Sequence, residues 1–257
     1  MSELLAHLDT LAEGARAMFW AGFLVFVRVG AMMALLPAFG EQTVPPRVRL
    51  AVTLAFTAVV VPAVFPMLPE APGPVAMLAE AVVGLMLGAG LRLLVHGLQT
   101  AGTMAAQATS LAQILGGAGV DPQPAMARVL VVAGLALAVA AGLHVRAAEL
   151  LILSYDMLPA GRFPAAEDAA QLGVAQVARA FALAFSLAAP FLIGSLVYNV
   201  ALGVINRAMP QLMVAFIGAP ALTAGGLILL AVLAPVMLTI WMQALAGQLA
   251  APLSVPR

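Results

Sequence analysis

The segment Tyr198-Asn-Val-Ala-Leu-Gly-Val-Ile-Asn-Arg-Ala-Met-Pro-Gln-Leu-Met-Val214 contains Arg207, the one charged side chain between residues 180 and 256. Its other polar side chains are mainly the carboxamides Asn199, Asn206 and Gln211. A cation at hydrocarbon depth costs at least about 3 kcal/mol, so Arg207 should lie at a membrane edge or face protein or water. We therefore predict a membrane protein in which these four residues make polar contacts between helices or between subunits.

Composition places the chain among integral membrane proteins. Of its 257 residues, 64% are hydrophobic and 9% charged, and the mean hydropathy is +1.10. Soluble domains have about 25% charged residues. The net charge is zero and every cation is arginine, which predicts no basic patch for nucleic acid or for lipid headgroups. Cysteine is absent and the three histidines are scattered, so we expect no disulfide, metal site or cofactor.

Six stretches are long and apolar enough for the roughly 20 residues that a membrane-spanning helix needs. They cover about 17–39, 50–68, 74–98, 129–153, 180–205 and 212–246. The last is too long for one straight crossing and contains Pro220, Gly225-Gly226 and Pro235. Because proline removes a backbone donor and bends a helix, a kinked helix or a helical hairpin is expected there. We predict an all-α fold of about six hydrophobic segments, bent and packed inside a larger assembly.

Three segments lie outside this pattern, within what we expect to be a single membrane domain, 1–257. Residues 1–16 have an acidic lead-in unlike a cleavable signal, and they form either an amphipathic helix at the membrane surface or a frayed tail. Residues 107–124 are rich in glycine and small residues, and residues 154–178 are polar. Both are predicted to be loops.

Several ionisable residues fall inside or near the ends of the apolar stretches, among them Arg28 and Glu80. Arg28 lies halfway along the first one, which favours pairing with another helix or subunit. Glu80 either couples protons or is a first-turn carboxylate near the interface. Gly84 and Gly88 form a Gly-x-x-x-Gly pattern, a weak signal for close helix packing.

No catalytic site is predicted. Tyr155-Asp156 resembles half of an intramembrane aspartyl protease site, but its Gly-x-Gly-Asp partner is missing from the sequence. Ser195 has no histidine on its span to act as a base. We therefore expect no enzymatic activity.

The glycine-rich segment has two readings. Gly116, Gly117 and Gly119 disfavour a stable helix, while the segment is too apolar for an ordinary solvated linker. It is either an adaptable stopper lying across a pore or a tight connection between two helices.

Several motifs resemble the FliR family of type III export-gate subunits. They are, in order, the run Phe26-Val-Arg-Val-Gly-Ala-Met-Met-Ala-Leu-Leu-Pro-Ala-Phe-Gly-Glu-Gln-Thr-Val-Pro-Pro-Arg-Val-Arg-Leu50, then Thr100-Ala-Gly-Thr-Met-Ala-Ala-Gln107, Asp121-Pro122, Leu158-Pro-Ala-Gly161, Asn199-Val-Ala-Leu-Gly-Val-Ile-Asn-Arg-Ala-Met-Pro-Gln-Leu212 and Phe216-Ile-Gly-Ala-Pro220. The resemblance covers about residues 17–246.

The resemblance implies a role in protein export across the bacterial inner membrane, in the flagellar basal body. The family's fold looks like one FliP joined to one FliQ, built of bent helical hairpins. With FliP and FliQ it forms a closed cone, with FlhB outside and FlhA below, which passes unfolded flagellar subunits. A virulence secretion system carries a similar subunit and is the alternative, and a small-solute transporter is a more distant one.

Two sets of site residues follow from this resemblance and from the polar residues above. The family's plug loop falls on residues that here are Gln107, Leu111, Ile114, Gly116, Gly117, Gly119 and Asp121. The polar residues expected to help assembly are Arg28, Asn199, Asn206, Arg207 and Gln211.

Overall fold

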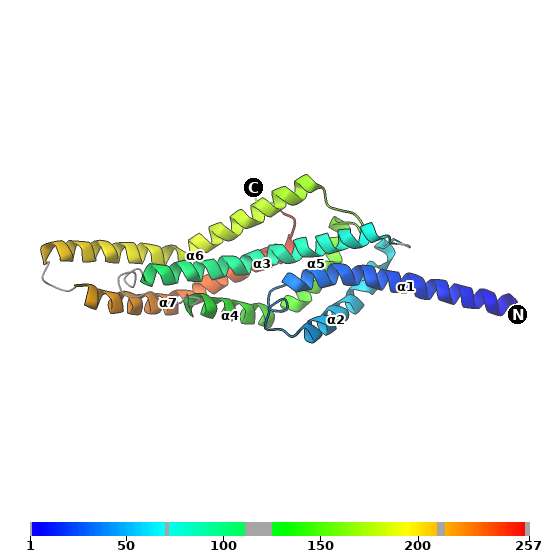
Figure 1. Cartoon of the computed structure of the whole chain (residues 1–257), viewed down its shortest axis with the longest axis horizontal. Helices are drawn as coiled ribbons and strands as arrows, with labels where there is room; N and C mark the ends of the chain where they lie inside the picture. Colours follow the sequence, from blue (N-terminus) through cyan, green and yellow to red (C-terminus); the bar gives the residue numbers. More distant parts are fainter. Residues whose placement is uncertain (1, 70–71, 111–124, 210–213, 255–257) are drawn as a thin grey trace. The chain divides into compact units, whose positions relative to one another are not determined.

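The computed structural model describes residues 2–69, 72–110, 125–209 and 214–254, and the described part is helical without a strand. Its helices, labelled in Figure 1, are α1 (Ser2–Leu35), α2 (Pro46–Val64), the short 3-10 helix η1 (Phe65–Met67), α3 (Pro74–Ser110), α4 (Ala125–Ala140), α5 (Leu143–Met157), α6 (Ala166–Ala208) and α7 (Val214–Ala250). Five of them are long and apolar enough to cross a membrane, or six spans if the bent pair α4 and α5 counts as one. The predicted all-α membrane fold is confirmed.

The helices divide into two compact units. One contains residues 1–92, 139–175 and 247–257, and the other contains residues 93–138 and 176–246. The helices α3, α4, α6 and α7 each contribute residues to both units. The single membrane domain expected from the sequence stays a prediction.

In the first unit, α1 packs closely against α3 through glycine. A Cβ on Gly88 would lie 2.7 Å from the carbonyl oxygen of Met32, and one on Gly84 would overlap the carbonyl oxygen of Arg28. Such contacts require that the helices approach without side chains between them. The Gly-x-x-x-Gly pattern is therefore a packing surface.

In the second unit, the remainder of α3 is surrounded in the same way. A Cβ on Gly97 would lie 2.9 Å from the carbonyl oxygen of Ala180 on α6, and a Cβ on Gly102 would overlap Ala127 on α4. The fully buried Trp241 of α7 donates its indole N–H to the carbonyl of Leu94 at 2.8 Å. Thus α3 is the element on which α4, α6 and α7 pack within this unit.

A sharp bend lies in the fourth apolar stretch. In the sixth, the helical hairpin that was one of the two expectations is absent, because α7 continues as one helix from Val214 to Ala250, through Pro220 and Pro235. The axes of α4 and α5 instead differ by 71°, at a break where Gly142 has φ +83°. That backbone conformation is easily adopted by glycine, so the turn is encoded at one residue.

The flanking segments differ in part from their predicted form. The structure continues α1 back to Ser2, so residues 2–16 are helical. Much of 154–178 is also helix, because α5 ends at Met157 and α6 begins at Ala166 with Glu167 and Asp168 in its first turn. Carboxylates there interact favourably with the helix dipole. Of the segment 107–124, residues 107–110 end α3, and 111–124 lie outside the described residues.

Candidate functional site

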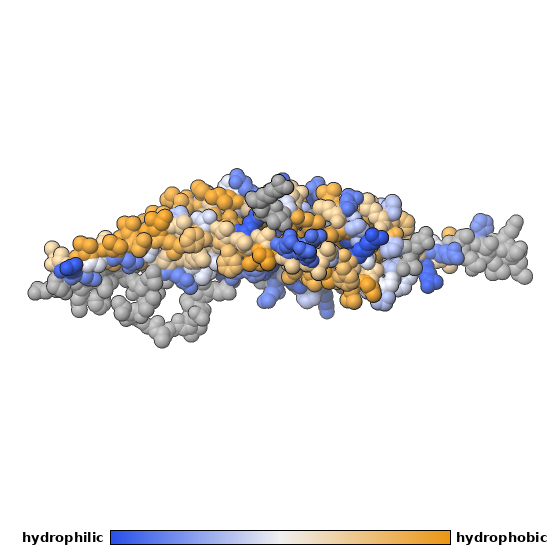
Figure 2. Space-filling model, turned by 90° about the horizontal axis from the view of Figure 1, so that it is seen from above, coloured by the Kyte–Doolittle hydropathy of each residue, from blue (hydrophilic) through white to orange (hydrophobic). Residues whose placement is uncertain are grey.

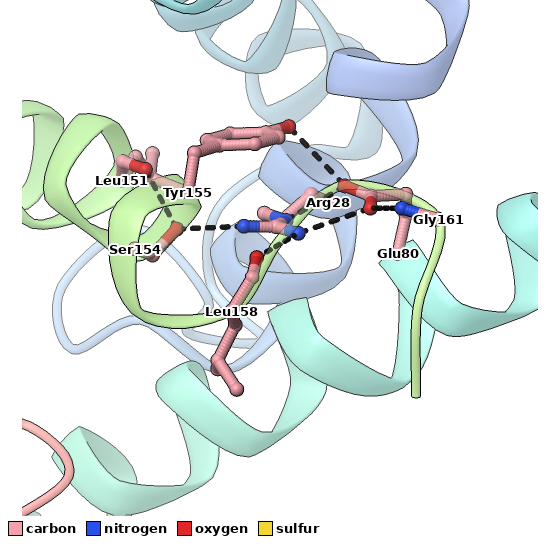
Figure 3. A network of polar contacts seen from close by, with 7 residues as sticks. All are labelled: Arg28, Glu80, Leu151, Ser154, Tyr155, Leu158 and Gly161. Carbon is pink, nitrogen blue, oxygen red and sulfur yellow. Dashed lines mark hydrogen bonds and ion pairs between the residues drawn. The ribbon is translucent and has the colours of Figure 1, made fainter. Parts of the chain in front are cut away.

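A buried ion pair joins α1 to α3. The guanidinium of Arg28 donates to both carboxylate oxygens of Glu80, from Nε to Oε2 at 2.7 Å and from Nη2 to Oε1 at 3.0 Å. Both side chains are 0% exposed (Figure 3). Burying two charges costs several kcal/mol, and only good geometry with further hydrogen bonds offsets that cost.

The remaining donors of Arg28 are bound by the end of α5. Its Nη1 donates to the hydroxyl oxygen of Ser154 at 3.0 Å, and its Nη2 also donates to the carbonyl of Leu158 at 3.0 Å. The ring of Tyr155 lies against the guanidinium, with its centroid 3.7 Å from Cζ. One cation thereby contacts three separate elements of the fold.

Glu80 is satisfied in the same way. Besides Arg28, its Oε2 accepts from the hydroxyl of Tyr155 at 3.2 Å and its Oε1 accepts from the backbone N–H of Gly161 at 2.8 Å. A carboxylate has about four acceptor positions, and four donors occupy them here. The expected first-turn position of Glu80 is wrong, because α3 begins at Pro74 and has no acidic residue in its first turn; the carboxylate is fully buried.

The close approach of α1 and α3 makes this geometry possible. Gly84 follows Glu80 by one helical turn, and its missing side chain lets α3 lie against the backbone of α1 at Arg28. The long arginine side chain then reaches both Glu80 and the turn after α5, where Gly161 has φ +74°. Figure 3 shows the seven residues of this network converging from α1, α3, α5 and the turn.

This network of buried polar contacts holds separate helices together. Its charges neutralise each other and most of its polar atoms have partners inside the chain, so it ties α1, α3, α5 and the following turn to one point. In the described part of the chain, no group of three or more His, Asp or Glu side chains is placed to hold a metal ion.

A second polar cluster connects α6 with the end of α3. The hydroxyl of Ser195 donates to the carbonyl of Ala108 at 2.6 Å, and the amide of Asn199 donates to the carbonyl of Ser195 at 2.8 Å. A pocket of about 380 Å³ adjoins them, lined by Met104, Gln107, Ala108, Leu192, Ser195, Leu196 and Asn199. The structure therefore brings together Gln107, predicted in the plug, and Asn199, predicted to help assembly.

The other predicted residues are not brought together. Asn206 and Arg207 are exposed near the end of α6, and the structure shows no hydrogen bond or ion pair to either among the described residues. Leu111, Ile114, Gly116, Gly117, Gly119, Asp121 and Gln211 lie outside the described residues. The assembly role of Arg207 stays a prediction, now directed to contacts between subunits.

Comparison with known proteins places the chain in a family. The family described as bacterial export proteins, family 1, matches residues 19–247. The chain belongs to this family. It is 35% identical over 225 residues to the flagellar biosynthetic protein FliR of Caulobacter vibrioides, covering 85% of this chain and 90% of that protein. It is 28% identical over 224 residues to FliR of Escherichia coli, covering 84% of each.

This match confirms the family resemblance drawn from the sequence motifs. As a member of the FliR family, the chain is a multi-pass membrane component of the flagellar type III export apparatus. Two of the motifs that carry the resemblance meet in the buried network, since Arg28 belongs to the first and Leu158 to Gly161 form another.

Sequence reasoning found Arg28 but missed its partners. Glu80 stands 52 residues away, and nothing in that spacing indicates contact. A usable signal was present: Arg28 is the one charge in the first apolar stretch and Glu80 is the one carboxylate in the third, and an unpaired charge inside the membrane is costly. Tyr155 and Ser154 gave no comparable signal.

Proposed function

We propose that this chain is a structural subunit of a closed export gate that passes unfolded flagellar proteins across the inner membrane. The observation that carries the proposal is a mismatch between helix length and bilayer thickness. Helix α6 has 43 residues, about 64 Å at 1.5 Å per residue, while the hydrocarbon core is about 30 Å thick. A tilt of about 60° would be needed to keep a straight helix of this length inside it, beyond the usual range of up to about 40°.

Part of α6 therefore lies outside the hydrocarbon core, and the surface of its C-terminal half is apolar. Five outward side chains on its C-terminal half form one stripe at helical spacing and are 59–65% exposed: Ile193, Leu196, Val197, Val200 and Val204. Figure 2 shows that hydrophobic residues also cover much of the visible surface elsewhere. Apolar surface of this extent indicates a site of protein association.

Arg207 completes this stripe. It follows Val204 by three residues and Val200 by seven, so it lies on the same face of α6. An apolar stripe that ends in an exposed arginine is the composition expected of a protein interface, in which arginine is enriched. Arg207 thus supports a contact between subunits better than a transport site.

The partners in this proposal are FliP and FliQ in the core of the gate, with FlhB and FlhA adjacent. We predict that an affinity-tagged chain, purified from native membranes in mild detergent, retains FliP and FliQ. Arg207→Ala should reduce that retention, with Arg16→Ala as a control on an exposed arginine of α1. Equal retention by the two variants would remove Arg207 from the interface.

The gate proposal includes the plug at residues 107–124. A cell that carries a deletion of residues 116–119 should leak ions through its inner membrane, because the stopper would be shortened. Membrane potential measured with a fluorescent dye reports the leak. An unchanged potential, with the protein present at its normal level in the gate, would refute the plug.

A transporter for small solutes is the competing function. It requires converging polar groups that are free to bind a solute at mid-membrane. The buried network offers little of this, because all four acceptor positions of Glu80 are occupied within the chain. A purified chain that binds a solute as a stable monomer would favour the transporter over the gate.

A further inference from the structure

The hydroxyl of Ser195 binds a helix other than its own. A serine or threonine inside a helix commonly donates to the carbonyl three or four residues earlier on the same helix. Examples in this chain are Thr53, Thr57, Thr103, Thr109, Ser154 and Thr239. Ser195 of α6 instead donates to the carbonyl of Ala108 on α3 at 2.6 Å, and so joins two residues that are 87 positions apart. The bond therefore serves contact between helices.

The acceptor of this bond lies at the end of α3. The last four carbonyls of a helix have no partner within that helix, and Ala108 is among the last four residues of α3, which is described to Ser110. Ala108 is 3% exposed and Ser195 is 5% exposed. A buried carbonyl without a partner is unfavourable. The hydroxyl of Ser195 thus caps α3 from a neighbouring helix.

Asn199 supports this hydroxyl from one turn further along α6. Its amide nitrogen donates to the carbonyl of Ser195 at 2.8 Å and to Oγ of Ser195 at 3.1 Å. A hydroxyl has one hydrogen to donate and two lone pairs that accept. The amide of Asn199 occupies a lone pair of Oγ, and the hydrogen of the hydroxyl goes to Ala108. Both polar side chains therefore act on the same end of α3.

The next residue of α3 is held by α7. Thr109 is buried, and a Cβ added to Gly226 would overlap its methyl group. A residue without a side chain is required for so close an approach. A Cβ added to the adjacent Gly225 would meet no atom. Ala108 and Thr109, two successive residues, are thus held by α6 and α7 (Figure 1).

A cavity beside this contact makes the hydrogen bond necessary. The cavity of about 380 Å³ is lined in part by Met104 and Gln107 of α3 and by Leu192 and Leu196 of α6. Dispersion attraction is lost across a gap between side chains, so packing alone holds α3 and α6 together weakly on this side. The directional bond from Ser195 sets the distance between the two helices where packing does not.

We propose that Ser195 is a positioning residue for the predicted plug, because it fixes the place at which α3 ends. This role rests on the proposed function, in which the plug begins at Gln107 in the last turn of α3. With Ala108 and Thr109 held, Gln107 keeps one position relative to α6. A helix end that frays would let the plug start at varying positions, and a stopper without a fixed starting point seals poorly.

Spin labels test the position of the helix end. The chain has no cysteine, so Gln107→Cys with Val204→Cys gives one labelled pair in the purified full chain. Distances between the two labels should be narrowly distributed in this background and broader once Ser195→Ala is added. Ser195→Thr retains a hydroxyl and should restore the narrow distribution. Thr239→Ala removes a hydroxyl that bonds within α7, and it should change nothing.

Gly226→Ala is a second variant, which does not depend on the hydrogen bond. Its methyl group would press against Thr109, so the distance between the labels should shift. Gly225→Ala is the matched control, because its methyl group enters open space and should leave the distance unchanged. Should Ser195→Ala fail to fold, these two glycine variants carry the test.

Membrane potential in cells that carry each variant without labels tests the role in the plug. Ser195→Ala and Gly226→Ala should lower the potential reported by the dye, as the deletion of residues 116–119 should, at a normal amount of chain in the gate. Ser195→Thr, Thr239→Ala and Gly225→Ala should keep the potential of the wild type.

Two results would overturn this role of Ser195. Label distances that are unchanged in both Ser195→Ala and Gly226→Ala would show that neither contact sets the end of α3. Altered distances with an unchanged potential, in a strain background where the deletion of residues 116–119 leaks, would separate Ser195 from the plug. A deletion that does not leak would instead refute the plug itself, and the label distances would still decide whether Ser195 places the helix end.

Discussion

At the scale of single residues, the pair of Arg28 and Glu80 should dominate the stability of the first unit. Glu80→Gln leaves a buried cation without its counter-charge, and breaking such a pair costs about 3–5 kcal/mol. The thermal midpoint in detergent should fall by about 10 °C. Glu149→Gln, which neutralises an exposed carboxylate on α5, should leave the midpoint near that of the wild type.

The double variant Arg28→Leu with Glu80→Leu separates charge from packing. Replacing both members of a buried pair by apolar residues is often close to neutral, so the double variant should be more stable than Glu80→Gln. A double variant that melts below the single one would show that the hydrogen bonds to Leu158 and Gly161, and not the ion pair, hold this unit together.

The glycines of α3 give a second prediction at this scale. Gly84→Ala would place a methyl group against the backbone of α1, and overpacking of this kind costs about 1–3 kcal/mol. Gly173→Ala, on α6 with open space around its Cα, should instead be neutral or slightly stabilising, since alanine favours helix. Thermal midpoints of the two variants measure the difference, and equal midpoints would contradict the close approach at Gly84.

Contacts between residues distant in the sequence were predicted least well. The unfavourable energy of an unpaired charge predicted that Arg28 has a partner, but it did not name Glu80. The close packing at Gly84 and Gly88 was recognised, because both residues of the Gly-x-x-x-Gly pattern lie within one short segment of the sequence. Contacts of Ser154 and Tyr155 depend on the turn after α5, whose geometry no pattern in the chain specifies.

At the scale of elements, the lengths of the apolar stretches predicted the membrane spans. The positions of proline and glycine did not predict where the sharp bend lies. Pro220 and Pro235 were expected to kink the sixth stretch or to turn it into a hairpin, and α7 is one continuous helix without the hairpin. Proline removes one hydrogen bond in a helix, and neighbouring turns can retain the rest. The actual bend depends on Gly142, whose φ of +83° cannot be seen in a residue that is one of 23 glycines.

Gly142→Ala tests that bend. A Cβ there meets no other atom, so the expected loss of about 1–2 kcal/mol is conformational alone. The midpoint should fall by a few degrees, and spin labels on α4 and α5 should report a broader distance distribution. Gly22→Ala, in open space within α1, is the matched control and should not lower the midpoint. Identical behaviour of the two variants would mean that packing alone sets the 71° angle.

At the scale of the whole molecule, sequence predicted the class of protein but not its surface. The hydrophobic stretches were recognised from composition, because bilayer thickness fixes how many apolar residues a span needs. Helices longer than the bilayer were not predicted, since the polar start of α6 reads as a loop. That length, together with the apolar stripe of α6, supports the proposed assembly with other subunits.

The stripe of α6 gives the last prediction. Val200→Asn places an amide at the centre of the stripe, and loss of a contact at the centre of an interface, where hot spots cluster, weakens binding by about tenfold or more. Retention of FliP and FliQ by the tagged chain should therefore fall about tenfold at a constant amount of membrane-inserted chain.

Val59→Asn is the control for that experiment, because Val59 is equally exposed but lies on α2, whose length suits contact with lipid. It should insert less efficiently without changing the ratio of FliP to tagged chain. An unchanged ratio in Val200→Asn would mean that lipid, and not protein, covers this stripe, and it would remove α6 from the interface with FliP and FliQ.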